Sequence, residues 1–320
     1  MRILITGATG FAGSHLADQL LTQDAVELWG AANTPDRPEY LDKRLQFVQV
    51  DLRNPVEVEQ LLASIRPERI YHLAGQAFVP QSWADPWETL EDNIRPQLNI
   101  IQVCLRHNLL DTRILSVCSN EEYGRLSPEE LPARENSPFR ADSPYGVSKL
   151  AQDFLAQAYF LSHHLPIIRV RPFNHIGPRQ KPTFSVPSFA RQIALIEAGR
   201  TEPTIHVGNL DARRDLSDVR DVVEAYERLM TGGERGRAYN ICSGVAVRVG
   251  DVLDQLVRLS RTAVRVIVDP DRLRPEDAPL VLGDPARIQR ELGWSPQHTL
   301  PETLRDTLDW WRAQVPSSFA

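Results

Sequence analysis

The chain has 320 residues, of which 42% are hydrophobic and 24% are charged, and its formal net charge at pH 7 is −6. These values are typical of a globular protein with one large or two modest domains, and they exclude an overall basic surface for nucleic acid. The cysteines are widely spaced, at Cys104, Cys118 and Cys242, which argues against a disulfide framework or a cysteine-based zinc site. We therefore expect no metal and no nucleic-acid partner.

The N-terminal residues, from Met1 to Gly7, enter a predicted strand at once, without the apolar region and cleavage site of a secretory signal. No apolar run approaches the roughly 20 residues that a membrane-spanning helix needs. These features predict a cytoplasmic protein without a membrane partner.

Short apolar runs alternate with helical patterns through the first half of the chain, as is typical of a parallel sheet with crossover helices. The first strand is predicted at residues 3–6 and its helix at 14–21. Further strands are predicted, in chain order, at 26–31, 45–50, 70–73, 114–117 and 167–170. The sequence therefore predicts an α/β fold with a doubly wound parallel sheet of the Rossmann type.

The regular alternation weakens after Pro172. The proline-rich stretch 127–144 is predicted to be a loop that leads into a helix at Tyr145. Helices are predicted at 186–198 and 219–230, a strand at 238–241, and polar loops at 208–215 and 269–279. We expect a first domain at 1–172, which residues 217–243 rejoin, and a smaller C-terminal domain at 173–320.

The turn between the first strand and its helix reads Gly7-Ala8-Thr9-Gly10-Phe11-Ala12-Gly13. Glycines at such a turn let the backbone approach a pyrophosphate closely, and the N-terminus of the helix that follows attracts the anion. A purely structural turn can share this G-x-x-G-x-x-G pattern. The strand before it and the helix after it favour a dinucleotide site that includes Thr9, Phe11 and Ala12.

Other strand ends are candidates for the same site. Asp51-Leu52 closes the third strand, where an adenine ring is expected, and Leu73-Ala74-Gly75 follows the fourth, beside the middle of the cofactor. After the second strand, an acidic residue would bind the ribose 2′-hydroxyl, but Asn33 stands there, with Arg37 nearby. The pattern favours NADP and leaves NAD open, because there is no clear arginine pair.

The segment Tyr145-Gly146-Val147-Ser148-Lys149 carries groups for proton transfer. Residues four apart share one face of a helix, so the Lys149 ammonium is expected near the Tyr145 phenol, where it would favour ionisation. An ordinary amphipathic helix with a packed tyrosine and a solvated lysine is the alternative. Together with Ser119 and the glycine turn, the segment predicts an enzyme.

These motifs resemble the extended short-chain dehydrogenases/reductases of the branch that modifies nucleotide sugars, over nearly the whole chain. The three strings 74–79, 173–180 and 208–215 are most similar to reductases that form GDP-rhamnose from GDP-4-keto-6-deoxymannose, although GDP-mannose 4,6-dehydratases share several of them. The motifs that carry the family resemblance are the glycine turn, Ser119 before Tyr123-Gly124, Tyr145-x-x-x-Lys149, Arg171-Pro172-Phe173-Asn174, Arg214-Asp215 before Asp218-Val219, and Arg274-Pro275-Glu276.

The resemblance implies hydride transfer from the reduced nicotinamide to a sugar C4 ketone. Tyr145 would protonate the forming alkoxide, Ser119 would hydrogen-bond the same oxygen, and Lys149 would hold the nicotinamide ribose. Pro172 joins the expected cofactor contacts. A catalytically silent dinucleotide-binding protein has no need of this trio.

Glu121 keeps a second activity open. In the related dehydratases the residue at this position removes the sugar C5 proton, so a GDP-mannose 4,6-dehydratase with recycled NADP is the alternative, followed by a 4-epimerase. The string after Asn174 departs from the dehydratase pattern, which favours the reductase.

The resemblance also assigns a substrate side. Guanidinium groups clamp diphosphates, and Arg214 and Arg274 are the candidates for a GDP-linked sugar, although a salt-bridged surface loop is the alternative for Arg214. Gln76 and Asn174 are expected near the phosphates or sugar, and Glu276 near a ribose or guanine edge. Relatives pair the helices at 90–105 and 145–161, so a homodimer is expected.

Overall fold

The computed structural model describes residues 1–273 and 278–315. The chain divides into two compact units. Unit 1 contains Met1–Pro172, Val223–Ile241 and Pro285–Trp294, and unit 2 contains the described residues of 173–222, 242–284 and 295–320.

Unit 1 is built on a sheet of seven parallel strands in the order β3-β2-β1-β4-β5-β6-β10. This order reverses between β1 and β4, as in a Rossmann sheet, so the predicted fold class is confirmed. The strand predicted at 238–241 forms there as β10 and pairs with β6 at the sheet edge. The strands are β1 (Arg2–Thr6), β2 (Glu27–Ala32), β3 (Gln46–Gln49), β4 (Arg69–His72), β5 (Arg113–Val117), β6 (Ile167–Pro172) and β10 (Ala238–Ile241).

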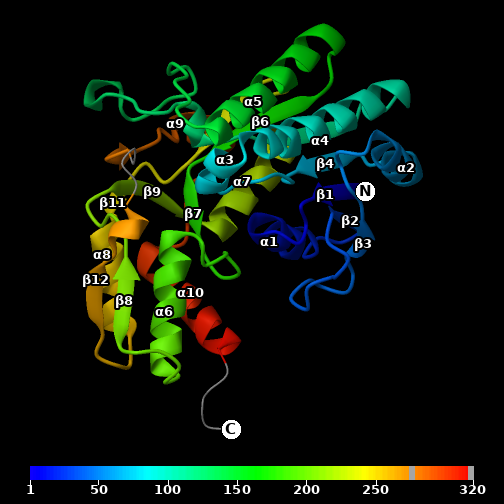
Figure 1. The fold of residues 1–320 in the computed structure, drawn as a ribbon. Helices are drawn as coiled ribbons and strands as arrows, with labels where there is room; N and C mark the ends of the chain where they lie inside the picture. Colours follow the sequence, from blue (N-terminus) through cyan, green and yellow to red (C-terminus); the bar gives the residue numbers. More distant parts are fainter. Residues whose placement is uncertain (274–277, 316–320) are drawn as a thin grey trace. The chain divides into compact units, whose positions relative to one another are not determined.

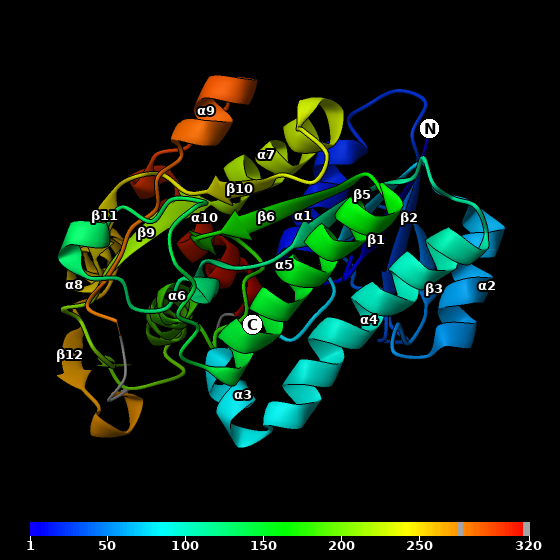
Figure 2. The same ribbon diagram turned by 90° about the horizontal axis from the view of Figure 1, so that it is seen from above.

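Helices cover both faces of this sheet (Figures 1 and 2). On one face, α2 (Pro55–Ile65), α4 (Pro86–Arg106) and α5 (Pro144–His163) enclose an apolar core with the strands. On the other lie α1 (Phe11–Leu20) and α7 (Val219–Gly232), which the Gln19 amide links through a hydrogen bond to Glu227 (3.0 Å). The remaining elements of unit 1 are α3 (Val79–Ala84), α9 (Ala286–Leu292) and the short 3-10 helices η1 (Asn120–Glu122) and η2 (Pro128–Glu130).

Unit 2 has smaller sheets. β7 (Asn174–Ile176), β11 (Ala246–Arg248) and β13 (Leu280–Val281) all pair with β9 (Arg213–Asp218), while β8 (Thr204–Val207) pairs with β12 (Arg265–Val268). A second apolar core forms among its helices and strands. The helices are α6 (Ser185–Glu197), α8 (Val249–Leu259) and α10 (Leu300–Gln314), with the 3-10 helix η3 (Pro270–Arg272).

The prediction of a polar loop at 208–215 is wrong for its last three residues, because β9 begins at Arg213. The buried carboxylate of Asp215 is satisfied by main-chain N–H groups of Ser243 (2.8 Å), Gly244 (3.0 Å) and Gly283 (3.2 Å). These donors are distant in sequence, so a local polar pattern did not indicate a strand. Across the two described ranges, the helices are too short or too polar to traverse a lipid bilayer.

Candidate active site

The glycine turn is closely packed at the carboxyl end of β1. Gly7 has a φ of +72°, its N–H donates to the Ala31 carbonyl (2.8 Å), and its carbonyl accepts from Gly10 N–H (2.9 Å). A Cβ at Gly13 would lie 2.2 Å from the Gly7 oxygen, so this position accepts only glycine without movement of the backbone. Gly10 precedes α1 without a side-chain cap, and the N-terminus of a helix is the end that attracts an anion.

The other predicted cofactor positions gather at neighbouring strand ends. Ala74 N–H donates to the Thr6 hydroxyl (3.2 Å), and a Cβ on Gly7 would lie 2.9 Å from the Ala74 nitrogen. At Gly75 a Cβ would lie 2.5 Å from the Asn93 side-chain oxygen. The remaining candidates at this edge are Thr9, Phe11 and Ala12 on the turn, Asn33 after β2, Asp51 and Leu52 after β3, Leu73 after β4 and Pro172 at the end of β6.

Two of these candidates are engaged by neighbouring groups. The Arg37 guanidinium donates to the carbonyls of Leu45 (3.2 Å), Leu41 (3.2 Å) and Asp42. Asp51 accepts from the Arg53 side chain (2.9 Å), and this hydrogen bond lowers the pKa of the Asp51 carboxyl. Arg37 therefore stabilises its own loop in this structure.

Ser119, Tyr145 and Lys149 meet in the interior of unit 1, where each is at most 8% exposed. α5 begins directly before Tyr145, because Pro144 suits the first helical position and the Ser143 hydroxyl accepts from Gly146 N–H (3.0 Å). The Lys149 Nζ lies 6.0 Å from the centre of the Tyr145 ring. It donates to the Val117 carbonyl (2.9 Å) and to the Gln152 side-chain oxygen (2.8 Å).

Burial controls the ionisation of this pair. It raises the pKa of Tyr145, and the hydrogen bond with Ser119 opposes that rise only in part. Burial also lowers the pKa of Lys149. Burial is the largest influence on the Tyr145 phenol in this structure, and an effect of Lys149 on its ionisation stays a prediction. At neutral pH the Tyr145 phenol keeps its proton, which is the state that a proton donor requires.

Glu121 lies on η1, against the start of α5. A Cβ at Gly146 would lie 2.8 Å from the Glu121 carbonyl oxygen, so glycine allows η1 to approach the helix. The half-buried Glu121 carboxylate contributes to the raised pKa of Tyr145, after burial. The structure thus brings Glu121 to the neighbourhood of the phenol.

The predicted substrate residues fall in different places. The Gln76 amide group donates to the Phe78 carbonyl (3.0 Å) and the Thr89 hydroxyl (3.2 Å) within unit 1. In unit 2, Arg214 donates to the Ala278 carbonyl (2.7 Å). Asn174 is half-buried, and its side-chain oxygen has no hydrogen-bond partner within residues 1–273 and 278–315. Arg274 and Glu276 lie outside the described residues.

A cluster of three charged side chains near Ser119 was not predicted from the sequence, although Arg171 belongs to one of the family motifs. Glu122, Asp153 and Arg171 come from η1, α5 and β6 and are at most 2% exposed. The available signal was the arginine directly after the predicted strand at 167–170 and the aspartate four residues after Lys149.

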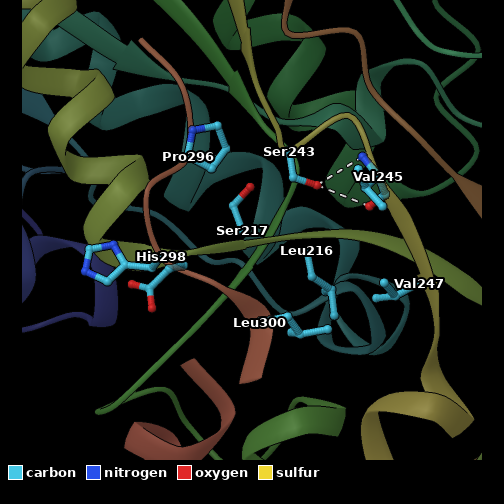
Figure 3. Close-up of a pocket in the computed structure, with 9 residues that line it drawn as sticks. Leu216, Ser217, Ser243, Val245, Val247, Pro296, His298 and Leu300 are labelled. Carbon is cyan, nitrogen blue, oxygen red and sulfur yellow. Dashed lines mark hydrogen bonds between the residues drawn. The ribbon is translucent and has the colours of Figure 1, made fainter. Parts of the chain in front are cut away.

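A cavity of about 180 Å³ lies within unit 2 (Figure 3). The Asp218 carboxylate at its wall already accepts from Arg220 (2.7 Å) and Thr303 (2.7 Å), so it offers little charge to a ligand. Figure 3 shows the Ser243 hydroxyl hydrogen-bonded to the main chain of Val245. Among the residues that the structure describes, none of the predicted catalytic, cofactor or substrate residues lines this cavity.

Known proteins resemble this chain over almost its entire length. A family model described as GDP-mannose 4,6 dehydratase matches residues 4–307. The GDP-6-deoxy-D-mannose reductase of Pseudomonas aeruginosa is 34% identical over 98% of both chains. The GDP-mannose 4,6-dehydratase of Vibrio cholerae is 27% identical over 95% of this chain and 91% of that protein.

Solved structures agree with these sequence matches. The structure of RMD from Pseudomonas aeruginosa complexed with NADPH superposes with a TM-score of 0.86 at 32% identity, over 98% of this chain and 99% of that one. The UDP-glucose 4-epimerase of Thermus thermophilus in complex with NAD gives a TM-score of 0.86 at 29% identity, over 98% of this chain and 100% of that one. The chain therefore belongs to the GDP-mannose 4,6-dehydratase family, within the extended short-chain dehydrogenases/reductases.

Proposed function

We propose that this chain is an NAD(P)H-dependent reductase that converts the C4 ketone of GDP-4-keto-6-deoxymannose to the alcohol of GDP-rhamnose. The observation that carries the proposal is the buried, protonated Tyr145 phenol beside the Ser119 hydroxyl, in a unit with a glycine turn suited to a dinucleotide. Support for the substrate comes from the reductase relative, whose 34% identity exceeds the 27–28% of the GDP-mannose dehydratases from Vibrio cholerae and Caenorhabditis elegans.

The residues present fit a nicotinamide dinucleotide. An added Cβ at Gly7, Gly13 or Gly75 would collide with neighbouring atoms, so all three positions require glycine in this conformation. The start of α1, which has no side-chain cap, suits a pyrophosphate. The proposed site also includes Asn33 and Arg37 near the adenosine ribose, with NADP favoured over NAD because the RMD neighbour holds NADPH. When bound, the reduced dinucleotide supplies the hydride.

The protein's own groups handle the proton. As the carbonyl oxygen gains charge, Tyr145 donates its phenolic proton to it, and the Ser119 hydroxyl stabilises the same oxygen by a hydrogen bond. The Lys149 ammonium retains donor capacity beyond its bonds to Val117 and Gln152, which we assign to the nicotinamide ribose. The burial of all three groups excludes water that would compete for these hydrogen bonds.

We propose that unit 1 is the dinucleotide-binding domain and that unit 2 holds the GDP-linked sugar through Asn174, Arg214, Arg274 and Glu276. Gln76 remains a predicted substrate residue. The expected cytoplasmic location remains a prediction.

The proposed homodimer pairs the helices at 90–105 and 145–161. It is supported by apolar side chains that α4 and α5 expose, such as Trp87 (73% exposed), Phe154 (50%) and Leu161 (63%). Sedimentation that detects only monomer at micromolar concentration would contradict the dimer.

A second function is favoured by one observation, the nearness of Glu121 to Tyr145. With Glu121 as the base for the C5 proton, the chain would be a GDP-mannose 4,6-dehydratase that recycles its cofactor. Two incubations separate the functions: GDP-mannose alone, and GDP-4-keto-6-deoxymannose with NADPH. Oxidation of NADPH in the second, with no keto sugar formed in the first, supports the reductase, whereas keto-sugar formation from GDP-mannose alone refutes it.

A further inference from the structure

A buried cluster of charged side chains lies directly behind Ser119 in unit 1. Glu122 and Asp153 are 0% exposed and Arg171 is 2% exposed. The Arg171 guanidinium donates through Nε to Asp153 Oδ2 (2.9 Å) and through Nη1 to the Tyr123 hydroxyl (3.0 Å). The proposed reaction gives none of these groups a role, although burying charge is costly.

Glu122 connects the cluster to Ser119. Its Oε1 accepts from the Ser119 main-chain N–H (2.9 Å), and its Oε2 lies 3.2 Å from Arg171 Nε. The Ser119 hydroxyl oxygen accepts from Glu121 N–H (3.2 Å). Because one lone pair of that oxygen is thereby used, the hydroxyl is oriented to donate its own hydrogen elsewhere. Glu122 thus fixes the backbone of the residue whose hydroxyl meets Tyr145.

The same local turn occurs elsewhere in the chain without burial. At η2, Ser127 N–H donates to Glu130 Oε2 (2.8 Å), but Glu130 is paired with Arg140 at the surface. A Ser-x-x-Glu turn therefore forms with a solvated carboxylate. Turn formation alone does not account for the full burial of the Glu122 carboxyl group, so a second cause is needed at this position.

We infer that Glu122 is a positioning residue for the proposed reduction: held by Arg171, which Asp153 anchors in turn, its carboxylate fixes Ser119 so that the hydroxyl donates to the oxygen of the C4 carbonyl. This inference rests on the proposed function. It assigns Glu122 an effect on turnover through Ser119, without contact with substrate or cofactor.

The role makes turnover depend on the ionisation of Glu122. The groups that face it are Asp153, Lys149 and Tyr145 of α5, Arg171 of β6, Cys118 after β5, and Tyr123. Burial and the Asp153 carboxylate raise the pKa of Glu122, and Arg171 opposes the rise. A carboxylate accepts a hydrogen bond more strongly than the neutral acid does, so kcat is expected to increase with pH as Glu122 ionises.

The test uses the full chain with NADPH and GDP-4-keto-6-deoxymannose, and measures kcat and KM against pH. For Glu122→Leu, which removes the acceptor of Ser119 N–H, we expect kcat to fall by about 10–100-fold. Glu122→Gln keeps the volume and one acceptor oxygen, so we expect a smaller fall and loss of the pH-dependent step. In both variants KM for NADPH should stay within about twofold, because the cofactor contacts are untouched.

Glu130→Gln is the matched control, because it changes the same turn at the surface, and its kinetics should equal those of the wild type. The inference is overturned if Glu122→Gln keeps the wild-type kcat and pH profile, or if Glu130→Gln causes the same losses. Should Glu122→Leu fail to fold, the profile of Glu122→Gln decides alone. If the wild-type chain does not oxidise NADPH with the keto sugar, the proposed function is refuted. If the wild type is active and the Glu122 variants behave like it, only the role of Glu122 is refuted.

Discussion

Gly13→Ala offers a direct test of the dinucleotide turn. The added Cβ would lie 2.2 Å from the Gly7 oxygen, 2.9 Å from the Gly7 carbonyl carbon and 3.0 Å from the Ala8 Cα, all of them backbone atoms. The Gly7 oxygen also accepts the Gly10 N–H. No side chain can rotate away, so the start of α1 must move from β1 by about 0.8 Å before the shortest contact reaches 3.0 Å.

Overpacking of this kind costs about 1–3 kcal/mol of stability. The same shift displaces the first amides of α1 from the pyrophosphate, so we expect the Kd for NADPH to rise by about 10–100-fold. Fluorescence titration with NADPH and urea unfolding measure the two effects.

Substitutions at two further glycines provide comparisons for the NADPH affinity of Gly13→Ala. At Gly10 a Cβ would meet the Gly7 oxygen at 3.1 Å, so Gly10→Ala should weaken binding less than Gly13→Ala. At Gly232, in α7, the nearest atom is the Leu292 Cδ2 at 3.1 Å, the end of a side chain that can move. Gly232→Ala should therefore leave NADPH binding unchanged. Wild-type affinity in Gly13→Ala would refute the assignment of the turn to the dinucleotide.

The remaining predictions concern the proton donor, the cofactor and pH. Tyr145→Phe should lower kcat by at least about 100-fold with little change in the Kd for NADPH, since only the proton donor is lost; retained turnover would remove Tyr145 from the mechanism. KM should be lower for NADPH than for NADH in steady-state kinetics, and a strong preference for NADH would contradict the assignment of NADP. Burial and Asp153 raise the pKa of Glu122 from 4.5 to about 8, so the stability that its protonated form contributes is present below pH 4.5 and is lost as pH rises through about 8. Urea unfolding between pH 6 and pH 9 should therefore show that the wild type loses stability relative to Glu122→Gln, on the order of a few kcal/mol. If the difference in unfolding free energy between the two proteins stays constant with pH, this reasoning is refuted.

The sequence by itself determined the strands of the Rossmann sheet and the position of the glycine turn. Apolar runs predicted the strands of the Rossmann sheet, and the spacing of Gly7, Gly10 and Gly13 predicted the turn, because both depend on neighbours within a few residues. The helix spacing of Tyr145 and Lys149 likewise placed them close together. Resemblance to a known family was needed for the substrate, since spacing alone does not specify a GDP-linked sugar.

Tertiary structure decided what depends on burial and on partners distant in sequence. The raised pKa of Tyr145 follows from desolvation in the assembled core, which the spacing of Tyr145 and Lys149 along a helix does not show. The polar start of β9 depends on Asp215 being satisfied by donors from distant segments. The ion pairs among Glu122, Asp153 and Arg171 join three elements. Local patterns therefore encode the strands of the Rossmann sheet, while the start of β9 and the charge state of Tyr145 and Glu122 arise only when the elements pack.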